Sequence, residues 1–479
     1  MKRRSKLILC CLSMLCLWLP GKAAQTDTIF SAQEFLALVK SYHPLVRKTG
    51  IQVDQAAMNL LFAKGLFDPA LNAANSNKTL DGLQYYQSSE AELVIPTWFG
   101  VEFKSGIEYL QGNRINTSET SGTLSYAGVQ IPILKNLVYD KRRAALQQAK
   151  QAQFMAYEEQ KLVLNQLIMD AMYAYFDWVQ AWELLQLADK NYSLNMNRMK
   201  LVVKSFELGE RAAIDTLEAY TLVQQFELLR NQHYLEFVRE GIYLSAYLWN
   251  EQTEPLMLNA TAQPEPRWER FGETWNNQLL LDSLLQEVND KHPGLQWYQY
   301  KLQVLKLDQK VKFQEMLPKL DVNYQLLSKN GLTGFNPAYD GFSPNRNSYY
   351  GIKFQMPLRL SEGRASYQLA KLKYRDAVLD RSMKKMELEN KVKKAVADFL
   401  FLEKQVSLQT NYVKNLELLA NAEQVKLELG ESSFFLTNSR DTKVVDAREK
   451  LIQLQVKRMM SLLSVPYSLG ILTEVSLQN

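Results

Sequence analysis

Residues 168–206 of the chain read IMDAMYAYFDWVQAWELLQLADKNYSLNMNRMKLVVKSF. Apolar side chains recur in this stretch at alternating steps of three and four residues, the heptad pattern of a coiled-coil seam. The surrounding segment 141–208 contains neither proline nor glycine, so nothing in it forces a helix to break. At ~1.5 Å per residue, the segment predicts a rod on the order of 100 Å long. The predicted seam positions are Ile168, Ala171, Tyr175, Trp178, Trp182, Leu185, Asp189, Tyr192, Met196, Met199, Val203 and Phe206.

A second rod is predicted near the carboxyl end, where the same spacing returns with ten apolar residues in twelve positions. Taken alone, the two rods indicate a long structural coiled coil. The positions of this second seam are Leu388, Val392, Ala395, Phe399, Leu402, Val406, Gln409, Val413, Leu416, Ala420, Glu423 and Leu427.

The first residues predict a secretory signal peptide at 1–23. Four basic residues precede an apolar run from Leu7 to Leu19, and Pro20 then leads to a small-residue site that ends at Ala23. The alternative, a retained membrane anchor, is disfavoured because the run is shorter than the ~20 residues a span needs. A lipid anchor on Cys16 is also disfavoured, because Leu15 is a poor residue before a lipidated cysteine.

Removal of this leader changes what the composition implies. All three cysteines, Cys10, Cys11 and Cys16, lie within it, so no thiol chemistry is expected in the mature chain. The leader also carries five basic and no acidic residues, which leaves the remainder of a chain of formal charge +5 at zero. Nothing in this balance points to nucleic acid.

No motif in the sequence points to catalysis, a cofactor or a metal. The three histidines, His43, His233 and His292, show no ligand spacing, and no Gly-rich phosphate loop is present. We therefore expect each histidine to cap or pack a helix, and we expect the protein not to be an enzyme.

The chain reads as a tandem duplication. Four landmarks of the first half recur in the same order in the second, which predicts a first repeat at 24–250, an equatorial linker at 251–278 and a second repeat at 279–479. The paired landmarks are His43-Pro44 and His292-Pro293, Pro69 and Pro318, Gln130-Ile131-Pro132 and Gln355-Met356-Pro357, and Leu208-Gly209 and Leu429-Gly430.

Between the prolines of each repeat lies a polar, aromatic region in which apolar residues alternate with polar ones. Such alternation suits strands with one lipid face and one wet face, although an ordinary soluble sheet fits the pattern too. The first region has 61 residues from Pro69 to Gln130 and the second has 37 from Pro318 to Gln355. The additional 24 residues form either a further strand pair or a long surface loop. The expected strands are 90–95, 101–107, 124–131, 321–327 and 348–356.

Segment lengths also predict how shorter helices stack. The return helix at 212–249 and the next helix at 293–316 are together nearly as long as one rod, so we expect them to stack end to end. By the same reasoning, the last helix of the chain would stack on residues 44–66. The linker would then surround the junction as a collar.

With these landmarks the chain resembles the TolC-type outer membrane factor family over essentially its whole mature length. The resemblance implies an α+β membrane protein: a homotrimer whose strands form one β-barrel in outer-membrane lipid, continued by a coiled-coil-packed α-helical barrel in the periplasm. It implies a passive exit duct, without cofactors, for small molecules such as drugs, within a tripartite efflux pump or type I secretion system. Its partners would be a periplasmic adaptor and, through it, an inner-membrane pump. The alternative is a periplasmic coiled-coil adaptor or scaffold without a barrel, for which the expected lipoyl-like domain is not found.

The resemblance also implies a gate at the periplasmic tip, near Gly209 and Gly430. Members of the family often carry an aspartate six residues after the tip glycine. The first repeat has Asp215 there, whereas the second has Leu436, so an acidic gate is expected in full only in the first. Two hypotheses are open for the charges around Asp215: they form a latch with a neighbouring helix, or they are solvated residues of a first helical turn. The candidate gate residues are Gly209, Arg211, Asp215, Glu218 and Gly430.

Overall fold

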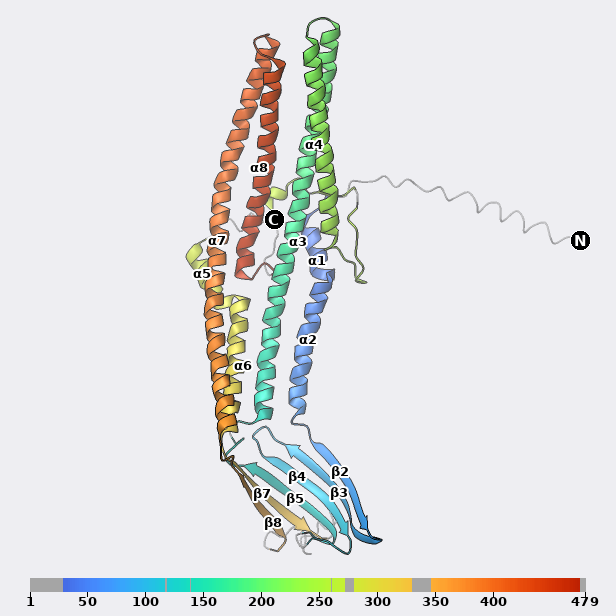
Figure 1. Ribbon diagram of the computed structural model, residues 1–479, viewed down its shortest axis with the longest axis vertical. Helices are drawn as coiled ribbons and strands as arrows, with labels where there is room; N and C mark the ends of the chain where they lie inside the picture. The colour runs from blue at the N-terminus through green and yellow to red at the C-terminus, as the bar shows by residue number, and fades with distance from the viewer. Residues whose placement is uncertain are drawn as a thin grey trace, which may run out of the picture.

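The computed structural model describes residues 29–116, 119–137, 139–259, 261–271, 280–329 and 346–473, so the predicted leader lies outside the described residues. In this structure two helical hairpins form one end of the molecule, and one β-sheet forms the other end. One long helix of each hairpin continues to the sheet beside shorter helices (Figure 1). In chain order the elements are β1 (Ile29–Phe30), α1 (Ala32–Tyr42), α2 (Pro44–Gly65), β2 (Ala70–Leu80), β3 (Leu83–Pro96), β4 (Glu102–Gln111), β5 (Gly122–Pro132), α3 (Lys141–Glu207), α4 (Ala213–Ser245), β6 (Gln263–Pro264), the 3-10 helix η1 (Trp268–Arg270), α5 (Leu281–Lys291), α6 (Pro293–Glu315), β7 (Lys319–Ser328), β8 (Ser348–Gln355), α7 (Ser361–Glu428) and α8 (Phe434–Leu469).

Both predicted rods are confirmed as single helices. Helix α3 has 67 residues and begins where Asp140 caps it, with the Asp140 carboxylate accepting the backbone N–H of Arg143 at 2.7 Å. Helix α7 has 68 residues. Each is therefore about 100 Å long. Among the helices of the described residues, none is apolar over a long enough stretch to span a bilayer.

The predicted seam is correct for α7 and for α3 as far as Met199, and it is wrong at the last two positions of α3, Val203 and Phe206. Every predicted position of α7 is buried or half-buried. In α3 the predicted Trp178 and Leu185 are buried, but after Trp178 a row of more deeply buried residues lies one position before the predicted ones, because the partners of α3 change from α2 and α6 to α4 along its length. This row consists of Ala181, Ala188, Asn195 and Val202, whereas the predicted Trp182, Asp189 and Met196 are half-buried and Val203 and Phe206 are exposed.

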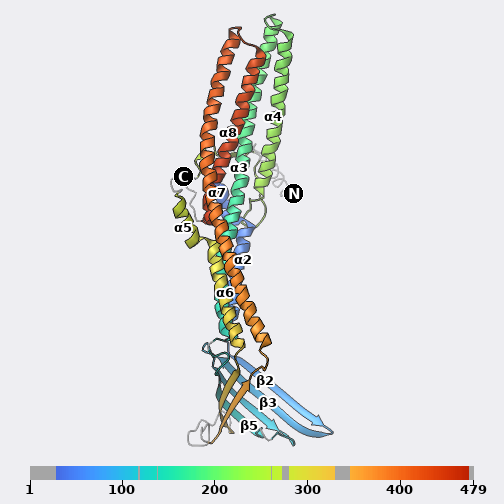
Figure 2. The ribbon, with the colours of Figure 1, turned by 60° about the vertical axis from the view of Figure 1, so that its left-hand side comes forward.

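The predicted stacking of the shorter helices is also wrong. Helix α4 stands over α2, where His43 lies 6.1 Å from Tyr247 between ring centroids and Arg47 donates to Thr253 Oγ1 at 2.7 Å. Helix α8 stands over α6, and Gly470 at its end lies against Pro293 (Figures 1 and 2). Length could not distinguish the two pairings, because α2 and α6 have 22 and 23 residues and α4 and α8 have 33 and 36.

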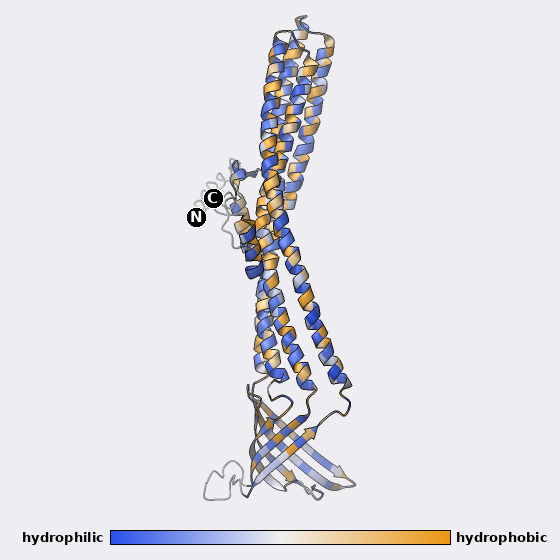
Figure 3. Cartoon of the chain, turned by 90° about the vertical axis from the view of Figure 1, so that its left-hand side faces the viewer, coloured by the Kyte–Doolittle hydropathy of each residue, from blue (hydrophilic) through white to orange (hydrophobic). Residues whose placement is uncertain are grey.

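The largest core lies at mid-height, where these junctions meet. Tyr175, Phe176 and Trp178 of α3 are fully buried there. The Tyr175 hydroxyl donates to the carbonyl oxygen of Phe30 at 2.8 Å, and Trp268, from the part of the linker that is described, lies 6.1 Å from Phe176 between ring centroids. In Figure 3 apolar and polar residues alternate along the helices above and below this level. The core therefore fastens β1, the linker and α3 together.

The six longer strands form one antiparallel sheet in the order β2-β3-β4-β5-β7-β8. All five predicted strands are present in it. The additional residues of the first region form strands rather than a loop: with β2 following Pro69 and β5 containing Gln130, β3 and β4 are the extra pair. Residues 117 and 118, between β4 and β5, lie outside the described residues.

The strand register sorts the sheet into one apolar and one polar face. Cross-strand partners point to the same side of a sheet, and alternate residues of a strand point to opposite sides. One row of partners runs Ile95, Phe103, Val129, Tyr324 and Tyr350. The neighbouring row, on the opposite face, runs Val94, Lys104, Gly128, Gln325 and Tyr349.

The polar face carries a group of carboxylates on the extra strands. The Tyr126 hydroxyl lies 2.9 Å from Glu92 Oε2 and 3.2 Å from Glu90 Oε1. On the apolar face, by contrast, Leu71, Ile352 and Phe354 are 75%, 68% and 62% exposed. A single copy of the chain thus leaves a sheet-wide apolar surface uncovered.

Candidate gate at the helical tips

Both hairpins turn at a glycine in the left-handed region, with φ of +78° at Gly209 and at Gly430. At the first tip the N–H of Glu210 donates to the carbonyl of Ser205 at 2.9 Å, and that of Gly209 to the carbonyl of Phe206 at 2.9 Å. This pair of bonds is a Schellman motif, which requires positive φ at the residue after the helix. The second tip has the equivalent bonds. The repeated Leu-Gly-Glu is therefore a helix-ending signal, and it places Gly209 and Gly430 at the same end of the molecule (Figure 1).

At the first tip the structure brings Arg211 and Asp215 together. The Arg211 Nη1 lies 3.6 Å from Asp215 Oδ2, one helical turn apart in the chain. Asp215 stands in the first turn of α4, whose amino end has no side-chain cap, so its carboxylate also complements the helix dipole. The two side chains are 29% and 26% exposed, which limits such a pair to about 0.2–1 kcal/mol.

Arg211 also connects the first tip to the second hairpin. Its guanidinium lies 5.8 Å from the ring centroid of Phe434, the first residue of α8. Phe434 is buried and packs with Val202 and Ala219 of the first hairpin. Phe434 could not be predicted from the sequence as part of the tip, because its partners lie more than 200 residues away in the chain. The conspicuous Phe434-Phe435 pair at a helix start was the one signal available.

Glu218 is not part of this contact. Its backbone carbonyl accepts the Thr221 hydroxyl at 2.9 Å, and among the described residues its half-buried carboxylate forms no ion pair. Of the predicted gate residues, the structure thus joins Arg211 and Asp215 and leaves Glu218 one turn further along α4.

The second tip is built differently. Leu436 is 39% exposed, and the Ser433 hydroxyl caps α8 by accepting the N–H of Leu436 at 3.2 Å. Ser432 donates to Glu423 Oε1 at 2.6 Å, which ties the turn to the end of α7. The second tip thus combines hydroxyl contacts with an ion pair of 3.8 Å between Arg440 Nε and Glu423 Oε2, whereas the first tip has the Arg211–Asp215 pair.

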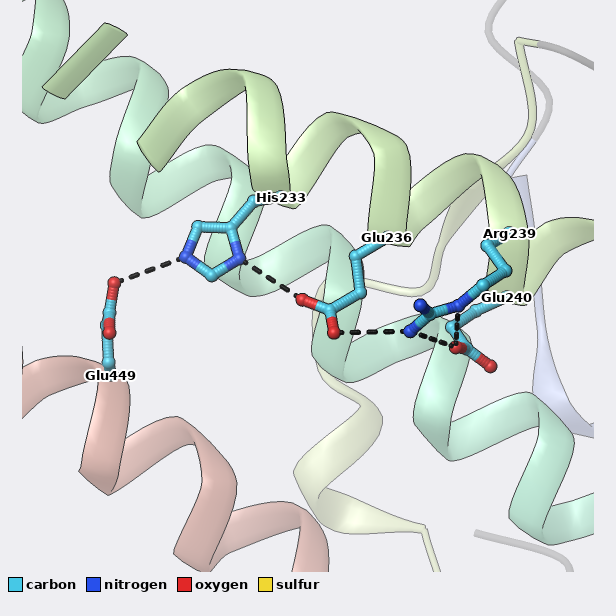
Figure 4. Close-up of polar contacts among 5 residues, drawn as sticks. All are labelled: His233, Glu236, Arg239, Glu240 and Glu449. Atoms are coloured by element: carbon cyan, nitrogen blue, oxygen red, sulfur yellow. Dashed lines mark hydrogen bonds and ion pairs between the residues drawn. The ribbon is translucent and has the colours of Figure 1, made fainter. Parts of the chain in front are cut away.

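Two ionic contacts lower on the hairpins hold them side by side. Arg198 Nη1 of α3 lies 2.5 Å from Asp441 Oδ2 of α8. Further down, His233 Nε2 of α4 lies 3.2 Å from Glu449 Oε1 of α8, and its Nδ1 lies 3.4 Å from Glu236 Oε2 (Figure 4). The bonds to these carboxylates raise the pKa of His233 above its ordinary value, and burial opposes that rise. Glu236 is a local neighbour of His233, but the contact with Glu449 could not be predicted because the two residues are 216 positions apart in the chain.

The other two histidines are helix caps, as predicted. The Nδ1 of His43 accepts the N–H of Leu45 at 3.2 Å, and that of His292 accepts the N–H of Gly294 at 3.0 Å. Burial, with Lys384 and Lys391 nearby, lowers the pKa of His292 to about 4. Within the part of the chain that the structure describes, no cluster of His, Cys, Asp and Glu could hold a metal ion.

Comparison by sequence finds no family model and no curated protein that matches the chain. Comparison with solved structures does find matches. CusC, described in the context of transmembrane channel formation, is 14% identical with a TM-score of 0.62 over 91% of each chain. The CmeC outer membrane channel of Campylobacter jejuni is 12% identical with a TM-score of 0.62, over 91% of this chain and 85% of that one. The MtrE outer membrane channel of Neisseria gonorrhoeae, in its open state, is 13% identical with a TM-score of 0.62, over 91% and 88%.

The chain has the TolC-type outer membrane factor fold. At this level of identity the likeness is one of fold, and it extends over nine-tenths of the chain. In the TolC-type fold described above, the sheet forms one end and the two tips form the other. The extra strands β3 and β4 and the Arg211–Asp215 pair are observed in the structure of this chain and do not follow from the comparison.

Proposed function

We propose that this protein is a subunit of a trimeric exit duct in the outer membrane of a cell. The sheet of each copy contributes to a β-barrel in the membrane, and the helices form a tunnel through the periplasm. Small molecules such as drugs pass through it passively. A periplasmic adaptor couples the tips to an inner-membrane pump of a tripartite efflux or type I secretion assembly.

One observation carries this proposal: a sheet with one apolar and one polar face stands at the end of a helical rod. The exposed apolar face, with Leu71, Ile352 and Phe354, would cost free energy in water, at roughly 25 cal/mol for each Å². In lipid that cost disappears, while the polar face, with Glu90 and Glu92, lines a wet lumen. An adaptor or scaffold that remained in the periplasm would have no use for such a surface.

The tips support the duct proposal in a second way. A tunnel that reaches the outside must close when idle, and each copy brings Gly209 and Gly430 to the end opposite the sheet. A contact worth about 1 kcal/mol or less per copy is weak enough for an adaptor to open. In the proposed duct the Arg211–Asp215 pair therefore contributes to closure, and the sheet lies in the membrane.

Fractionation and surface labelling test the proposal together. We expect the protein in the outer membrane as a trimer that dissociates on heating in mild gels. A single cysteine replacing Asn113, just beyond the far end of β4, should react with an impermeant reagent on intact cells. A single cysteine replacing Leu358, which is 99% exposed between β8 and α7, should react only after the outer membrane is broken. A soluble monomer, or labelling of Leu358→Cys alone on intact cells, would exclude the duct and favour the adaptor or scaffold.

A further inference from the structure

The sheet ends in two open edges. All eleven residues of β2 are exposed, and so are seven of the eight residues of β8. Each edge carries backbone N–H and C=O groups directed away from the sheet. In lipid an unpaired backbone group costs several kcal/mol, so a sheet that enters a membrane must close on itself or on another copy.

We propose that β8 of one copy pairs with β2 of the next, so that three copies close an eighteen-stranded barrel. The partner at each edge is a second copy of this chain. This inference rests on the trimeric duct proposed above and adds to it the number of strands, the order of the edges and their register.

Strand direction permits this closure. The sheet is antiparallel throughout, and its six strands alternate in direction. Because six is an even number, β8 runs opposite to β2, and the new contact is antiparallel like the other five. The ends agree as well: Ala70 begins β2 near the helices, and Gln355 ends β8 near them.

The two faces of the sheet restrict the register. The apolar face contains Leu71 and Ala73 on β2, and Ile352 and Phe354 on β8. A shift by one residue would turn one strand's apolar side chains into the lumen. Pairing Gln355 with Ala70 satisfies this condition, because it sets Phe354 opposite Leu71 and Ile352 opposite Ala73.

Barrel geometry narrows the registers that the faces permit, and this register has a tilt within the range of membrane barrels. Following partners across the sheet from Ala70 leads to Tyr349 on β8, six residues from Gln355. If Gln355 pairs with Ala70 of the next copy, each copy contributes a shear of six, and the shear of eighteen equals the strand number. Equal values give a strand tilt of about 36°. Moving the pairing by two residues in one direction lowers the tilt to roughly 27°, below the range of about 35–45° for membrane barrels. Moving it by two residues in the other direction raises the tilt to roughly 45°, the upper limit of that range.

The extra strands β3 and β4 thus become part of the wall. Without them each copy would contribute four strands and the barrel twelve. With strands ~4.8 Å apart and tilted by about 36–40°, twelve strands give a diameter of about 24 Å and eighteen about 35 Å. Barrels of sixteen to eighteen strands leave an open aqueous channel. The insertion in the first repeat therefore widens the membrane part of the duct by about half.

Disulfide cross-linking tests the register. The double variant Ala73→Cys with Ile352→Cys should give covalent trimers on oxidation, because directly opposed residues of antiparallel strands lie within disulfide reach. Leu71→Cys with Phe354→Cys is a second pair in the same register. Ala74→Cys with Ile352→Cys is the matched control, since its two side chains point to opposite faces and should not cross-link.

The competing arrangement has its own signature. If β2 and β3 lay outside the wall, β8 would meet β4, and Ser105→Cys with Ile352→Cys would cross-link instead. A trimer in the outer membrane that gives this result, or that cross-links at neither Ala73 nor Leu71, overturns the eighteen-stranded closure and leaves the duct intact. Absence of a trimer before oxidation would instead contradict the duct itself.

Distances across the barrel provide a second readout. Spin labels on Val129→Cys of β5 should lie about 30 Å apart in an eighteen-stranded trimer, because threefold-related points are separated by about 1.7 radii. Separations near 20 Å would indicate twelve strands and contradict the proposal.

Discussion

Gly470 at the end of α8 lies so close to Pro293 at the start of α6 that a Cβ atom on the glycine would stand 2.7 Å from Cδ of the proline. Gly470 also has a φ of +76°, where side chains other than glycine are strained. Two separate helices meet here without a covalent link, and this close contact makes them act as one rod beside α7.

Gly470→Ala should destabilise this junction. The left-handed φ costs roughly 1 kcal/mol for alanine, and overpacking against a proline ring adds about 1–3 kcal/mol. We expect a loss of about 2–4 kcal/mol, seen as a lower Tm of the purified protein in detergent. Gly50→Ala is the matched control: Gly50 lies within α2 with open space around it, so alanine should stabilise the helix by roughly 0.5–1 kcal/mol. An unchanged Tm for Gly470→Ala would mean that α8 and α6 do not press on each other.

The stacking of these helices shows where sequence reasoning reached its limit. The helices themselves could be predicted, because the seams and the Leu-Gly-Glu ends are local signals. The His43 and His292 caps follow from local signals as well. Which helix stands on which depends on contacts such as Gly470 with Pro293, and the near-equal lengths of α2 and α6 hide it. The same limit applies to the gate, where Asp215 was found but its neighbour Phe434 was not.

His292 should make the protein sensitive to acid. Its Nδ1 accepts the N–H of Gly294, and a protonated ring could not accept that bond and would place a positive charge at a helix amino end. Its folded pKa of about 4 lies below the unfolded value of 6.5, so its contribution is fully present above pH 6.5 and is lost as the pH falls towards 4. The loss amounts to about 3 kcal/mol.

His292→Asn provides the test, because asparagine caps a helix without titrating in this range. The fall in Tm between pH 7 and pH 4.5 should be smaller in this variant than in the wild type. Parallel pH profiles for the two proteins would show that His292 does not titrate on unfolding.

His233 should act in the opposite direction. Glu449 of α8 and Glu236 of α4 raise its pKa, while Asp446 lies one turn from Glu449 on α8. A raised folded pKa gives a contribution that is fully present below pH 6.5 and is lost as the pH rises through the folded value. Contact between the two hairpins should therefore weaken at alkaline pH.

His233→Gln keeps a hydrogen-bonding group and removes the charge. Hydrogen bonds to charged groups are worth about 1.5–3 kcal/mol, so we expect a loss of that order at pH 6 and a much smaller one at pH 9. Hydrogen exchange of α4 and α8 measures the effect where it arises. Tyr234→Gln, at a neighbouring position that is 59% exposed, should leave exchange unchanged at both pH values. Equal losses at pH 6 and pH 9 would contradict the assigned protonation.

Two neighbouring tryptophans of α3 test the corrected seam. Trp178 is fully buried and stacks on Phe237 with ring centroids 5.9 Å apart, whereas Trp182 is half-buried and lies 5.1 Å from the same ring. Trp178→Ala should cost about 3–5 kcal/mol, and Trp182→Ala clearly less. Both variants lose one ring contact to Phe237, and Trp178→Ala also loses one to Tyr175, so the difference in Tm reports the deeper packing of Trp178. A larger loss for Trp182→Ala than for Trp178→Ala would contradict the deeper burial of Trp178.

The last prediction concerns the closed tip. Asp215 holds Arg211, and Arg211 lies over the ring of Phe434 of the second hairpin. Among the described residues at the tips, Arg211 is the one cation that joins the two hairpins, so the Asp215 carboxylate fixes its position. Three symmetric copies, each contributing about 0.2–1 kcal/mol, favour the closed state by about 0.6–3 kcal/mol, which an adaptor can overcome. Asp215→Ala should therefore raise the conductance of the purified trimer in a planar bilayer.

Arg211→Ala should raise the conductance similarly, and the double variant should add little to either single variant, because the two residues form one contact. Glu251→Ala removes an exposed carboxylate far from the tip and should leave the conductance low. Equal, low conductance in all of these variants would show that the Arg211–Asp215 pair is a solvated first-turn contact and that closure resides elsewhere.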